Sequence, residues 1–420
     1  MPRAKKKNVI RLAQAGLGGR GYGTMEYIID TFENVEVVAV CDPYEDRVER
    51  ALNTCKSKRP NTEVKGYTDY KEMVEDKNID AVLVTTSWNA HVQVAVAAMN
   101  AGKFAGIECG GACSIDDCWQ LVRTYERTGK WCMFMENCCY GQHELTLLRM
   151  IKDGRFGEMI HVEGGYQHDL RDEITHGHTN RHYRYDNYAN RCGDFYPQHG
   201  LGPMQKYLSI NRGNRMVTLS SMASKARGLH EFVVAEKGPD CEDAKVVWTE
   251  GDVVQTMIKC AHGETMLLTH DTSLPRPYSR GGKVQGTNGI WTEEGDRIYL
   301  QNKSANHNYE PFSNYIQADG YEHPLWRATR ESGDKGGGHG NMDYLVLAAF
   351  FYAIENGIEP PIDTYDAATL LAVTPLSEQS CALGGTAVAI PDFTDGKWIK
   401  RGPAPKSPYS LDEVPYDMFD

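Results

Sequence analysis

Short apolar runs alternate with amphipathic stretches over the first third of the chain. Buried parallel strands are predicted by the largely apolar runs Val9–Ala15, Val35–Val40, Ala81–Thr86, Phe104–Glu108 and Trp131–Met135. Helical patterns follow at Thr24–Phe32, after Ser87–His91 up to Asn100, after the capping pair Ser114 and Asp117, and over 143–153. This alternation predicts a doubly wound parallel sheet that binds its ligand at the carboxyl ends of the strands.

The pattern changes after Gly157 to β-type segments separated by turns. Strands are predicted at Met159–Tyr166, Met216–Met222, Val253–Cys260, Thr265–Asp271, Lys283–Gly286, Ile290–Thr292 and Ile298–Gln301. They indicate a largely antiparallel sheet. The segment 302–338 is polar and glycine-rich and is expected to be irregular, as is the segment 171–192. Helices are predicted at Asn341–Glu355 and Asp363–Val373, the second broken or kinked by Pro375.

A chain of 420 residues is too long for one typical core. We therefore expect an α/β protein of two domains. Residues 1–145 would form a Rossmann domain with a doubly wound parallel sheet. Residues 146–420 would form an α/β domain with a large, mostly antiparallel open sheet and a proline-containing tail that wraps back.

Charge and cysteine content narrow the choice of partners and compartment. The formal net charge of −12 argues against nucleic-acid binding. No apolar run approaches the ~20 residues of a membrane span, and no apolar signal core follows the basic start, so a cytoplasmic protein without membrane contact is expected. None of the twelve cysteines forms a CxxC pair, which favours free thiols in a reducing compartment. We also expect a homo-oligomer.

A glycine-rich turn follows the first predicted strand. Gly16, Gly18 and Gly21 match GxGxxG, with a strand before and a helix after. Such a turn lets the backbone and the helix N-terminus approach a pyrophosphate. Asp42 ends the second strand, where a carboxylate binds the adenosine ribose and repels a 2′-phosphate, so NAD is favoured over NADP; its alternative role is a helix cap. The predicted contacts with the adenosine and pyrophosphate are Gly16, Leu17, Gly18, Gly19, Arg20, Gly21 and Asp42.

Polar groups also follow the later strands of this domain. Because parallel strands end at one edge of the sheet, these groups are candidates for the nicotinamide side of the cofactor. They are Trp88, Asn89, His91, Glu108, Cys109, Glu136 and Asn137. Glu136 is also a catalytic candidate that would orient the ribose or a histidine; a carboxylate at a helix N-terminus is the alternative.

The stretch Val162–Pro203 concentrates hydrogen-bonding side chains with little hydrophobic periodicity. It contains Tyr166, His168, Asp169, Arg184, Tyr196 and His199. A polyhydroxylated ligand needs many donors and acceptors and a few groups that move protons; a polar surface loop is the alternative. The loop Pro275–Gly282, which carries Tyr278, would return to this site. His168, His176, His178 and His182 match no known ligand spacing, so no metal is expected.

Several motifs resemble the glucose-fructose oxidoreductase family (Gfo/Idh/MocA) over about residues 8–400. Most members carry Glu-Lys-Pro after the fifth strand, with a catalytic lysine, whereas this chain has Glu108-Cys109-Gly110. The departure is similar to one branch, the NAD-dependent glycosidases of glycoside hydrolase family 109. The motifs are Glu136–Gly141, Glu163–Leu170, Tyr196–Pro203 and Gly336–Gly340.

The resemblance implies a redox-assisted elimination of a small-molecule glycoside. The sugar is oxidised at C3, a base removes the acidified C2 proton while the C1 group leaves, water adds, and C3 is reduced again. Known activity in the family includes α-N-acetylgalactosaminidase, and the route tolerates both anomers. On this resemblance Tyr166, Tyr196, His199, Tyr278 and Arg184 bind the sugar, while Tyr166, His168 and His199 are candidates for proton transfer.

Two other functions fit the sequence. A conventional NAD-dependent sugar or polyol dehydrogenase would release NADH in each cycle. A non-catalytic NAD-binding sensor has no need of acid–base groups near the nicotinamide, so the clustered tyrosines and histidines argue against it. Which of Tyr166, His168 and His199 removes the C2 proton stays open.

Overall fold

The computed structural model describes residues 9–332 and 339–419. Within them the chain forms two compact units. Unit 1 comprises residues up to 137 together with 339–369 and 404–409, and unit 2 comprises 138–332, 370–403 and 410–419. Helix α14 (Met342–Asn356), which the sequence pattern grouped with the second domain, therefore belongs to unit 1. Gly336–Gly338 of the glycine-rich motif, and the basic start of the chain, lie outside the described residues.

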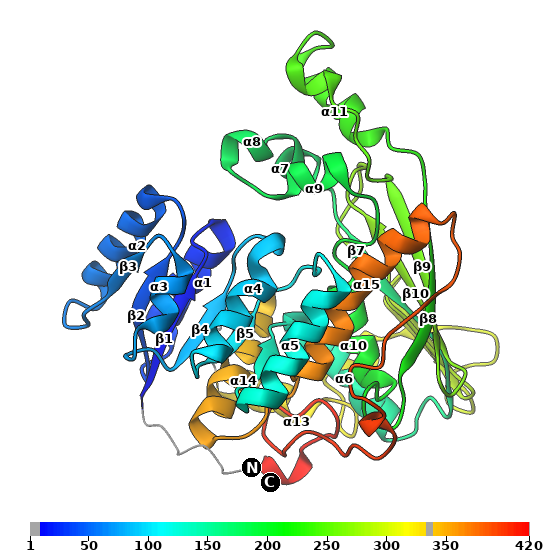
Figure 1. Cartoon of the computed structure of the whole chain (residues 1–420). Helices are drawn as coiled ribbons and strands as arrows, with labels where there is room; N and C mark the ends of the chain where they lie inside the picture. Colours follow the sequence, from blue (N-terminus) through cyan, green and yellow to red (C-terminus); the bar gives the residue numbers. More distant parts are fainter. Residues whose placement is uncertain (1–8, 333–338, 420) are drawn as a thin grey trace. The chain divides into compact units, whose positions relative to one another are not determined.

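Unit 1 is built on a six-stranded parallel sheet in the order β3-β2-β1-β4-β5-β6 (Figure 1). The strands are β1 (Ile10–Ala15), β2 (Val35–Cys41), β3 (Lys65–Tyr67), β4 (Ala81–Val84), β5 (Phe104–Ile107) and β6 (Cys132–Phe134). All five pairings are parallel. The strand order reverses between β1 and β4, which is where such sheets bind ligands. The predicted doubly wound sheet is confirmed.

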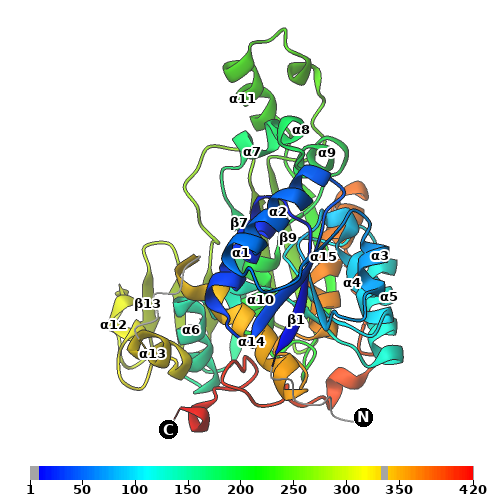
Figure 2. The ribbon, with the colours of Figure 1, turned by 90° about the vertical axis from the view of Figure 1, so that its left-hand side faces the viewer.

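The central strands of this sheet are buried on both sides, because helices cover both of its faces. Helices α3 (Tyr70–Glu75), α4 (Trp88–Asn100) and α5 (Ile115–Thr128) lie on one face, and α1 (Gly19–Thr31) and α2 (Glu45–Lys58) on the other (Figure 2). Ser114 and Asp117 form the expected capping box at the start of α5. Helix α1 begins at Gly19, five residues before the apolar pattern suggested, because the glycine-rich residues form its first turn.

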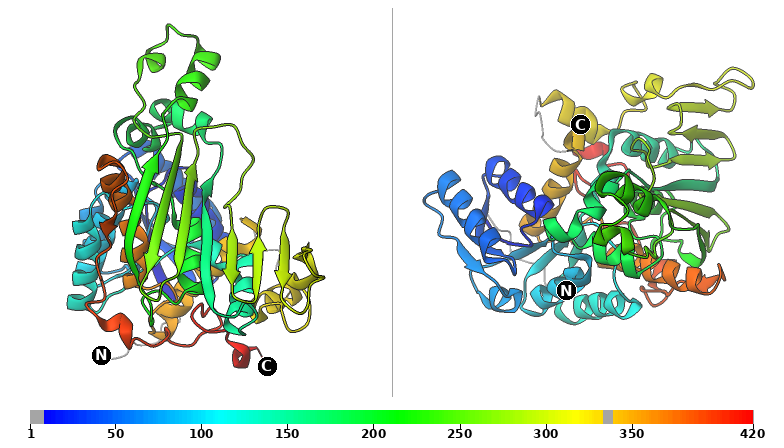
Figure 3. Two further views of the ribbon diagram at one scale, coloured as in Figure 1. Left: turned by 90° about the vertical axis from the view of Figure 1, so that its right-hand side faces the viewer. Right: turned by 90° about the horizontal axis from the view of Figure 1, so that it is seen from above.

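Unit 2 contains a nine-stranded sheet in the order β14-β13-β12-β11-β7-β10-β9-β8-β15 (Figure 3). Its pairings are antiparallel except for β7 with β10, so the expected mostly antiparallel sheet is confirmed. The strands are β7 (Met159–Gln167), β8 (Met216–Ala223), β9 (Val253–Cys260), β10 (Thr265–Asp271), β11 (Lys283–Gly286), β12 (Gly289–Thr292), β13 (Arg297–Leu300), β14 (Glu310–Pro311) and β15 (Val388–Ala389).

Helices occupy two segments of unit 2 that were expected to be irregular. Residues 171–192 hold α7 (Arg171–Thr175), α8 (Gly177–Asn180) and α9 (Arg184–Asn190), and residues 302–332 hold α12 (Ser313–Ile316) and α13 (Pro324–Glu331). These helices are too short to show a helical repeat in the sequence, and tertiary packing stabilises them. The unit also contains α6 (Gln142–Lys152), α10 (Gln198–Tyr207) and α11 (Gly228–Lys237).

The last long helix differs from its prediction. Helix α15 (Thr364–Ala382) continues past Pro375, which was expected to break or kink it. Proline removes one donor, but burial along the helix supports the remaining turns. Short 3₁₀ helices lie at Asn137–Tyr140, Glu242–Lys245, His339–Asn341, Lys397–Ile399 and Tyr416–Met418. In the described part of the chain, no helix combines the length and the apolar character needed to cross a membrane.

Candidate active site

The glycine-rich turn of unit 1 requires glycine at two positions for packing. Gly16 has φ +93°, and a Cβ on it would lie 2.5 Å from the carbonyl oxygen of Thr85. A Cβ on Gly21 would lie 2.4 Å from the Thr85 hydroxyl oxygen and would also collide with the Gly16 carbonyl oxygen. Around Gly18, in contrast, the nearest protein atom would be 3.8 Å from a Cβ, so glycine there leaves room. Gly18 is the N-cap of α1 and offers no side-chain acceptor. The first N–H groups of the helix are therefore suited to bind a pyrophosphate.

Asp42 lies against this turn. Its Oδ2 accepts a hydrogen bond of 2.8 Å from the Leu17 backbone N–H, and its Oδ1 accepts one of 3.0 Å from Tyr44. Asp42 does not cap α2, the alternative that the sequence allowed, because the N-cap of that helix is Tyr44 and no side chain caps it. The carboxylate lies at the position expected for a ribose ligand. Arg47 Nη1 lies 3.5 Å from Asp42 Oδ2, a cation that the sequence pattern did not single out.

Three of the residues predicted for the nicotinamide side lie in or beside the first turn of α4. Trp88 is buried against Gly110, where a side chain would collide with the indole. His91 is also buried, and burial lowers its pKa to about 4, so it is a neutral core histidine. Asn89 is exposed and its Oδ1 accepts a 3.4 Å hydrogen bond from the Cys113 thiol. Only Asn89 of the three is open to a ligand.

One hydrogen bond joins the residues that follow β5 and β6 to each other, and two further contacts join these residues to α1 and α14. The Cys109 thiol donates to Glu136 Oε2 at 3.1 Å, and both residues are buried. Glu108 accepts a 2.9 Å hydrogen bond from Arg20 Nε. Asn137 Nδ2 donates to Asp343 Oδ1 at 2.7 Å, and Arg20 contacts the same carboxylate. Asp343, which was not predicted from the sequence, therefore joins Arg20 to Asn137, and Arg20 also contacts Glu108.

In unit 2, Tyr166 is the last residue but one of β7, and its hydroxyl lies 3.0 Å from His168 Nδ1. Tyr166 and His168 are two residues apart in the sequence. The chain leaves the sheet after Gln167, and the two rings meet there. Burial raises the pKa of Tyr166, although the nearby charges of Arg184 and His199 act in the opposite direction. Burial also lowers the pKa of His168. A neutral tyrosine therefore faces a neutral imidazole.

Tyr196 and His199 reach Tyr166 because α10 packs directly on β7. A Cβ on Gly200 would lie 2.7 Å from the carbonyl carbon of Gly164, so the helix approaches the strand through glycine alone. The ring of Tyr166 lies 4.6 Å from that of Tyr196 and 5.5 Å from that of His199. The motifs at 163–170 and 196–203 thus form one aromatic cluster.

Tyr278 joins the cluster through a backbone bridge. Gln167 and Ser279 exchange two hydrogen bonds of 3.1 and 2.9 Å, which fixes the loop after β10 beside the end of β7. The Tyr278 ring lies 5.1 Å from His168 and 6.2 Å from Tyr166, and this side chain is 49% exposed. The expected return of this loop is confirmed, and Tyr278 forms an accessible wall of the cluster.

Arg184 supplies a buried cation. Its guanidinium carbon lies 5.3 Å from the centre of the Tyr196 ring, and its Nε lies 2.9 Å from Glu173 Oε1. Helices α7 and α9, in the segment expected to be irregular, position these two residues. Glu173 has no sequence signal beyond its charge and was not predicted. The cation favours the ionised form of the neighbouring Tyr166 phenol.

A fully buried polar layer lies next to this cluster. His270 pairs with Tyr166 across β10 and β7, and its Nε2 is 3.0 Å from the Tyr188 hydroxyl. Burial lowers the pKa of His270 to about 3. Burial raises the pKa of Asp194 to about 7, against a backbone hydrogen bond from Tyr196. His270 and Asp194 are 3.9 Å apart, and neither was predicted from the sequence.

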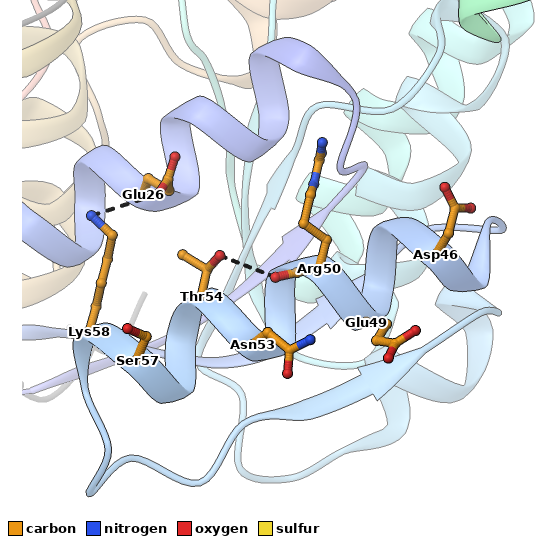
Figure 4. Close-up of a pocket in the computed structure, with 8 residues that line it drawn as sticks. All are labelled: Glu26, Asp46, Glu49, Arg50, Asn53, Thr54, Ser57 and Lys58. Atoms are coloured by element: carbon orange, nitrogen blue, oxygen red, sulfur yellow. Dashed lines mark hydrogen bonds and ion pairs between the residues drawn. The ribbon is translucent and has the colours of Figure 1, made fainter.

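A hollow lies on the surface of unit 1 between α1 and α2 (Figure 4). Its volume is about 590 Å³, and its lining includes Glu26, Glu49, Arg50 and Lys58. Lys58 lies 3.7 Å from Glu26 and 2.6 Å from Asp30. No residue of the aromatic cluster or the glycine-rich turn lines this hollow, so it is separate from the candidate site.

Two family models cover almost the whole chain. The model of the oxidoreductase family with an NAD-binding Rossmann fold matches residues 10–136, and the model of the glycosyl hydrolase 109 C-terminal domain matches residues 140–400. Unit 1 therefore contains an NAD-binding Rossmann domain.

Sequence relatives and solved structures extend this comparison. An alpha-N-acetylgalactosaminidase of Tannerella forsythia is 40% identical over 425 residues, covering 96% of this chain and 90% of the relative. A glycosyl hydrolase family 109 protein of Stenotrophomonas maltophilia is 40% identical, with 94% and 91% covered. An NAD binding oxidoreductase from Klebsiella pneumoniae superimposes with a TM-score of 0.68 at 16% identity, covering 91% of this chain and 99% of that one. Myo-inositol 2-dehydrogenase from Lactobacillus plantarum gives 0.63 at 17%, with 91% and 100% covered. At these identities the structures show a shared fold.

Proposed function

Since this chain belongs to glycoside hydrolase family 109, we propose that it hydrolyses glycosides by transient oxidation at C3 of the sugar. One observation carries the proposal beyond family membership: the Tyr166–His168 pair lies in one cluster with His199, Tyr196 and Arg184. Such a cluster offers several proton-transfer groups and a cation. It offers no pair of facing carboxylates of the kind that ordinary glycosidases use.

The residues of unit 1 fit the cofactor that this chemistry needs. The open space at Gly18, the uncapped start of α1 and the Asp42 carboxylate suit a pyrophosphate and an adenosine ribose. NAD, when bound, supplies the acceptor for the C3 hydrogen and its later donor. Because the cofactor is restored within each turnover, the chemistry needs it to stay bound.

We propose that Tyr166 and His168 act together as the base at C2. Burial keeps the phenol protonated, so Tyr166 alone is a poor base. His168 Nδ1, 3.0 Å away, is positioned to take the phenolic proton when Tyr166 receives the proton from C2. Arg184 would stabilise the negative charge that develops at C2 and on the C3 oxygen.

His199 is then available for the leaving group or for the C3 hydroxyl. Its ring lies 5.0 Å from Tyr196 and 5.5 Å from Tyr166, on the first turn of α10. We propose that Tyr196 and Tyr278 bind the sugar face, since aromatic rings offer flat contact area together with a hydroxyl. For Glu136 we propose a supporting role beside the cofactor, because it is buried and accepts a hydrogen bond from the Cys109 thiol.

Position 109 separates this proposal from the alternative dehydrogenase. The dehydrogenases of the wider family resemblance carry a lysine there, whereas Cys109 is buried and donates to Glu136. A thiol held in this way cannot replace the charge of a lysine. A dehydrogenase would also release one NADH for each sugar oxidised, which a hydrolase does not.

The substrate class follows from the relatives. Since the Tannerella forsythia relative carries the name alpha-N-acetylgalactosaminidase, we propose α-N-acetylgalactosaminides as the first substrates to test. The elimination route does not depend on the anomer, so β-glycosides belong in the same panel. Helices α7–α9, which position Arg184, are the part of unit 2 that would adapt the pocket to a different sugar.

The decisive experiment compares hydrolysis with NADH release. Purified protein is incubated with nitrophenyl glycosides of both anomers, before and after removal of NAD. We expect hydrolysis without accumulating NADH, and deuterium at C2 of the sugar released in heavy water. Stoichiometric NADH with an unlabelled C2 would bring the dehydrogenase forward. Hydrolysis undiminished in NAD-free protein would overturn both functions.

We also propose a cytoplasmic homo-oligomer with a role in carbohydrate metabolism. The twelve cysteines are all free thiols, which suits a reducing compartment. Met222 and Met257 are exposed on one face of the second sheet, where a second copy of the chain would cover them. Sedimentation of the wild type and of Met257→Glu tests the oligomer.

A further inference from the structure

Asp343 is the centre of a hydrogen-bond network in unit 1. It accepts a forked pair of bonds of 2.8 and 3.0 Å from Arg20, a bond of 2.7 Å from Asn137, and one of 2.9 Å from His339. Burial alone would raise the pKa of Asp343, but the bonds from His339 and Arg20 hold it well below its usual range. The Asp343 carboxylate is therefore ionised at neutral pH, and both of its oxygens accept hydrogen bonds.

The backbone around this network is held in an unfavourable conformation. His339, Gly340 and Asn341 have φ values of +45°, +62° and +75°, so three successive residues are left-handed. Such backbone persists only where neighbouring contacts determine it. The His339–Asp343 bond spans the three residues, and the Arg20 fork ties their far end to α1.

Arg20 connects the network to the glycine-rich turn. It lies in the first turn of α1, one residue before Gly21, and its Nε also donates to Glu108 at 2.9 Å. Arg20 is 39% exposed, whereas its partners Asp343 and Glu108 are 9% and 14% exposed, so two largely buried carboxylates hold a partly exposed cation. Arg20, Glu108, His339 and Asp343 also line a cavity of about 360 Å³, so this side of α1 is not close-packed.

We infer that Asp343 is a positioning residue for NAD: through Arg20 it fixes the first turn of α1 and so slows release of the cofactor. The inference rests on the use of NAD in the proposed function and adds the residue that governs its retention. A rigid turn presents its N–H groups to the pyrophosphate without ordering them at the moment of binding. Asp343 acts through Arg20 and needs no contact with the cofactor.

The loss of the negative charge and the loss of the ion pair predict opposite effects of Asp343→Asn on the rate of NAD release. Asp343→Asn removes a negative charge from the neighbourhood of an anionic pyrophosphate, so electrostatics alone would slow the release of NAD. Loss of the forked ion pair would instead loosen the turn and speed release. The direction of the change therefore separates the two causes.

The experiment measures exchange of bound NAD for isotopically labelled NAD in the holoprotein, with no glycoside present. We expect Asp343→Asn and Arg20→Lys each to speed exchange about 10- to 100-fold, as loss of a charged hydrogen bond does. Asp116→Asn is the matched control, because it removes the same charge from an exposed position in the first turn of α5. The melting temperature of NAD-free protein reports any general loss of stability.

The double variant decides whether the two residues act as one unit. Asp343→Asn with Arg20→Lys should exchange no faster than the faster single variant. Unchanged or slower exchange in Asp343→Asn, or multiplied effects in the double variant, would overturn the inference while leaving the proposed function intact. A wild-type protein that retains no NAD would overturn the proposed function, and this inference with it.

Discussion

Gly164 of β7 and Gly200 of α10 are in direct backbone contact: a Cβ on Gly164 would lie 2.9 Å from the Cα of Gly200. This contact sets the distance between the strand that carries Tyr166 and the helix that carries His199. Neither glycine has a positive φ, so close approach, and not backbone conformation, requires glycine here.

Gly200→Ala should therefore displace α10 from β7. Backbone atoms cannot move aside as a flexible side chain can, so we expect a loss of about 1–3 kcal/mol in the free energy of unfolding, as for other overpacked sites. Urea denaturation measures this loss, and glycoside hydrolysis should fall with it. Gly402→Ala, which meets no atom within 4 Å, should leave both unchanged.

Tyr166→Phe and His199→Ala should each lower the rate of hydrolysis by roughly 10²–10⁴-fold, the usual effect of removing a positioned acid or base. Both side chains belong to unit 2, so bound NAD measured after gel filtration should be unchanged. Tyr309→Phe, an exposed tyrosine of the same unit, is the control. Full activity in Tyr166→Phe would remove the phenol from the base.

Asp42→Ala should weaken NAD and improve NADP. The proposed role of the carboxylate is to bind the ribose hydroxyls and repel a 2′-phosphate, and its removal should let Arg47, now 3.5 Å from Asp42, pair with that phosphate. Titration of both cofactors into NAD-free protein measures the preference. The double variant Asp42→Ala with Arg47→Ala should lose the gain for NADP; a gain that persists would assign it to another cation.

Asp194→Asn should change the pH dependence of stability. Burial raises the pKa of Asp194 to about 7 in the folded protein, whereas an unfolded aspartate has its ordinary pKa of 3.8. The folded state thus binds the proton more tightly, and the stability it gains below pH 3.8 is lost as the pH rises to about 7. Asp194→Asn has no titrating group at this position, so its stability lacks this dependence on pH. Its free energy of unfolding relative to wild type should rise between pH 4 and 7 and then level off; a constant difference would contradict the raised pKa.

The twelve cysteines should all titrate as free thiols in unfolded protein prepared without reductant. The structure contains them as free cysteines, and most are buried. A thiol reagent added in denaturant measures their number. Several protected pairs would contradict the proposed cytoplasmic location.

The sequence by itself determined the sheets and the cofactor turn. Strands buried on both faces are continuous apolar runs, and GxGxxG between a strand and a helix is a local pattern, so β1, α1 and Asp42 were readable from neighbouring residues. The residues of the aromatic cluster could also be named from the sequence, because Tyr166, Tyr196, His199 and Tyr278 stand in motifs with little apolar character. Their roles as acid, base or sugar ligand remain predictions.

Tertiary structure decided what distant residues do to one another. Asp343 lies 323 residues from Arg20, and no local pattern announces their ion pair. The short helices α7–α9 have no repeat long enough to detect, and they form because packing stabilises them around Arg184 and Glu173. The pKa values of His91, His270 and Asp194 depend on burial. Burial is set by the folded chain and cannot be read from the residues next to each of them in the sequence.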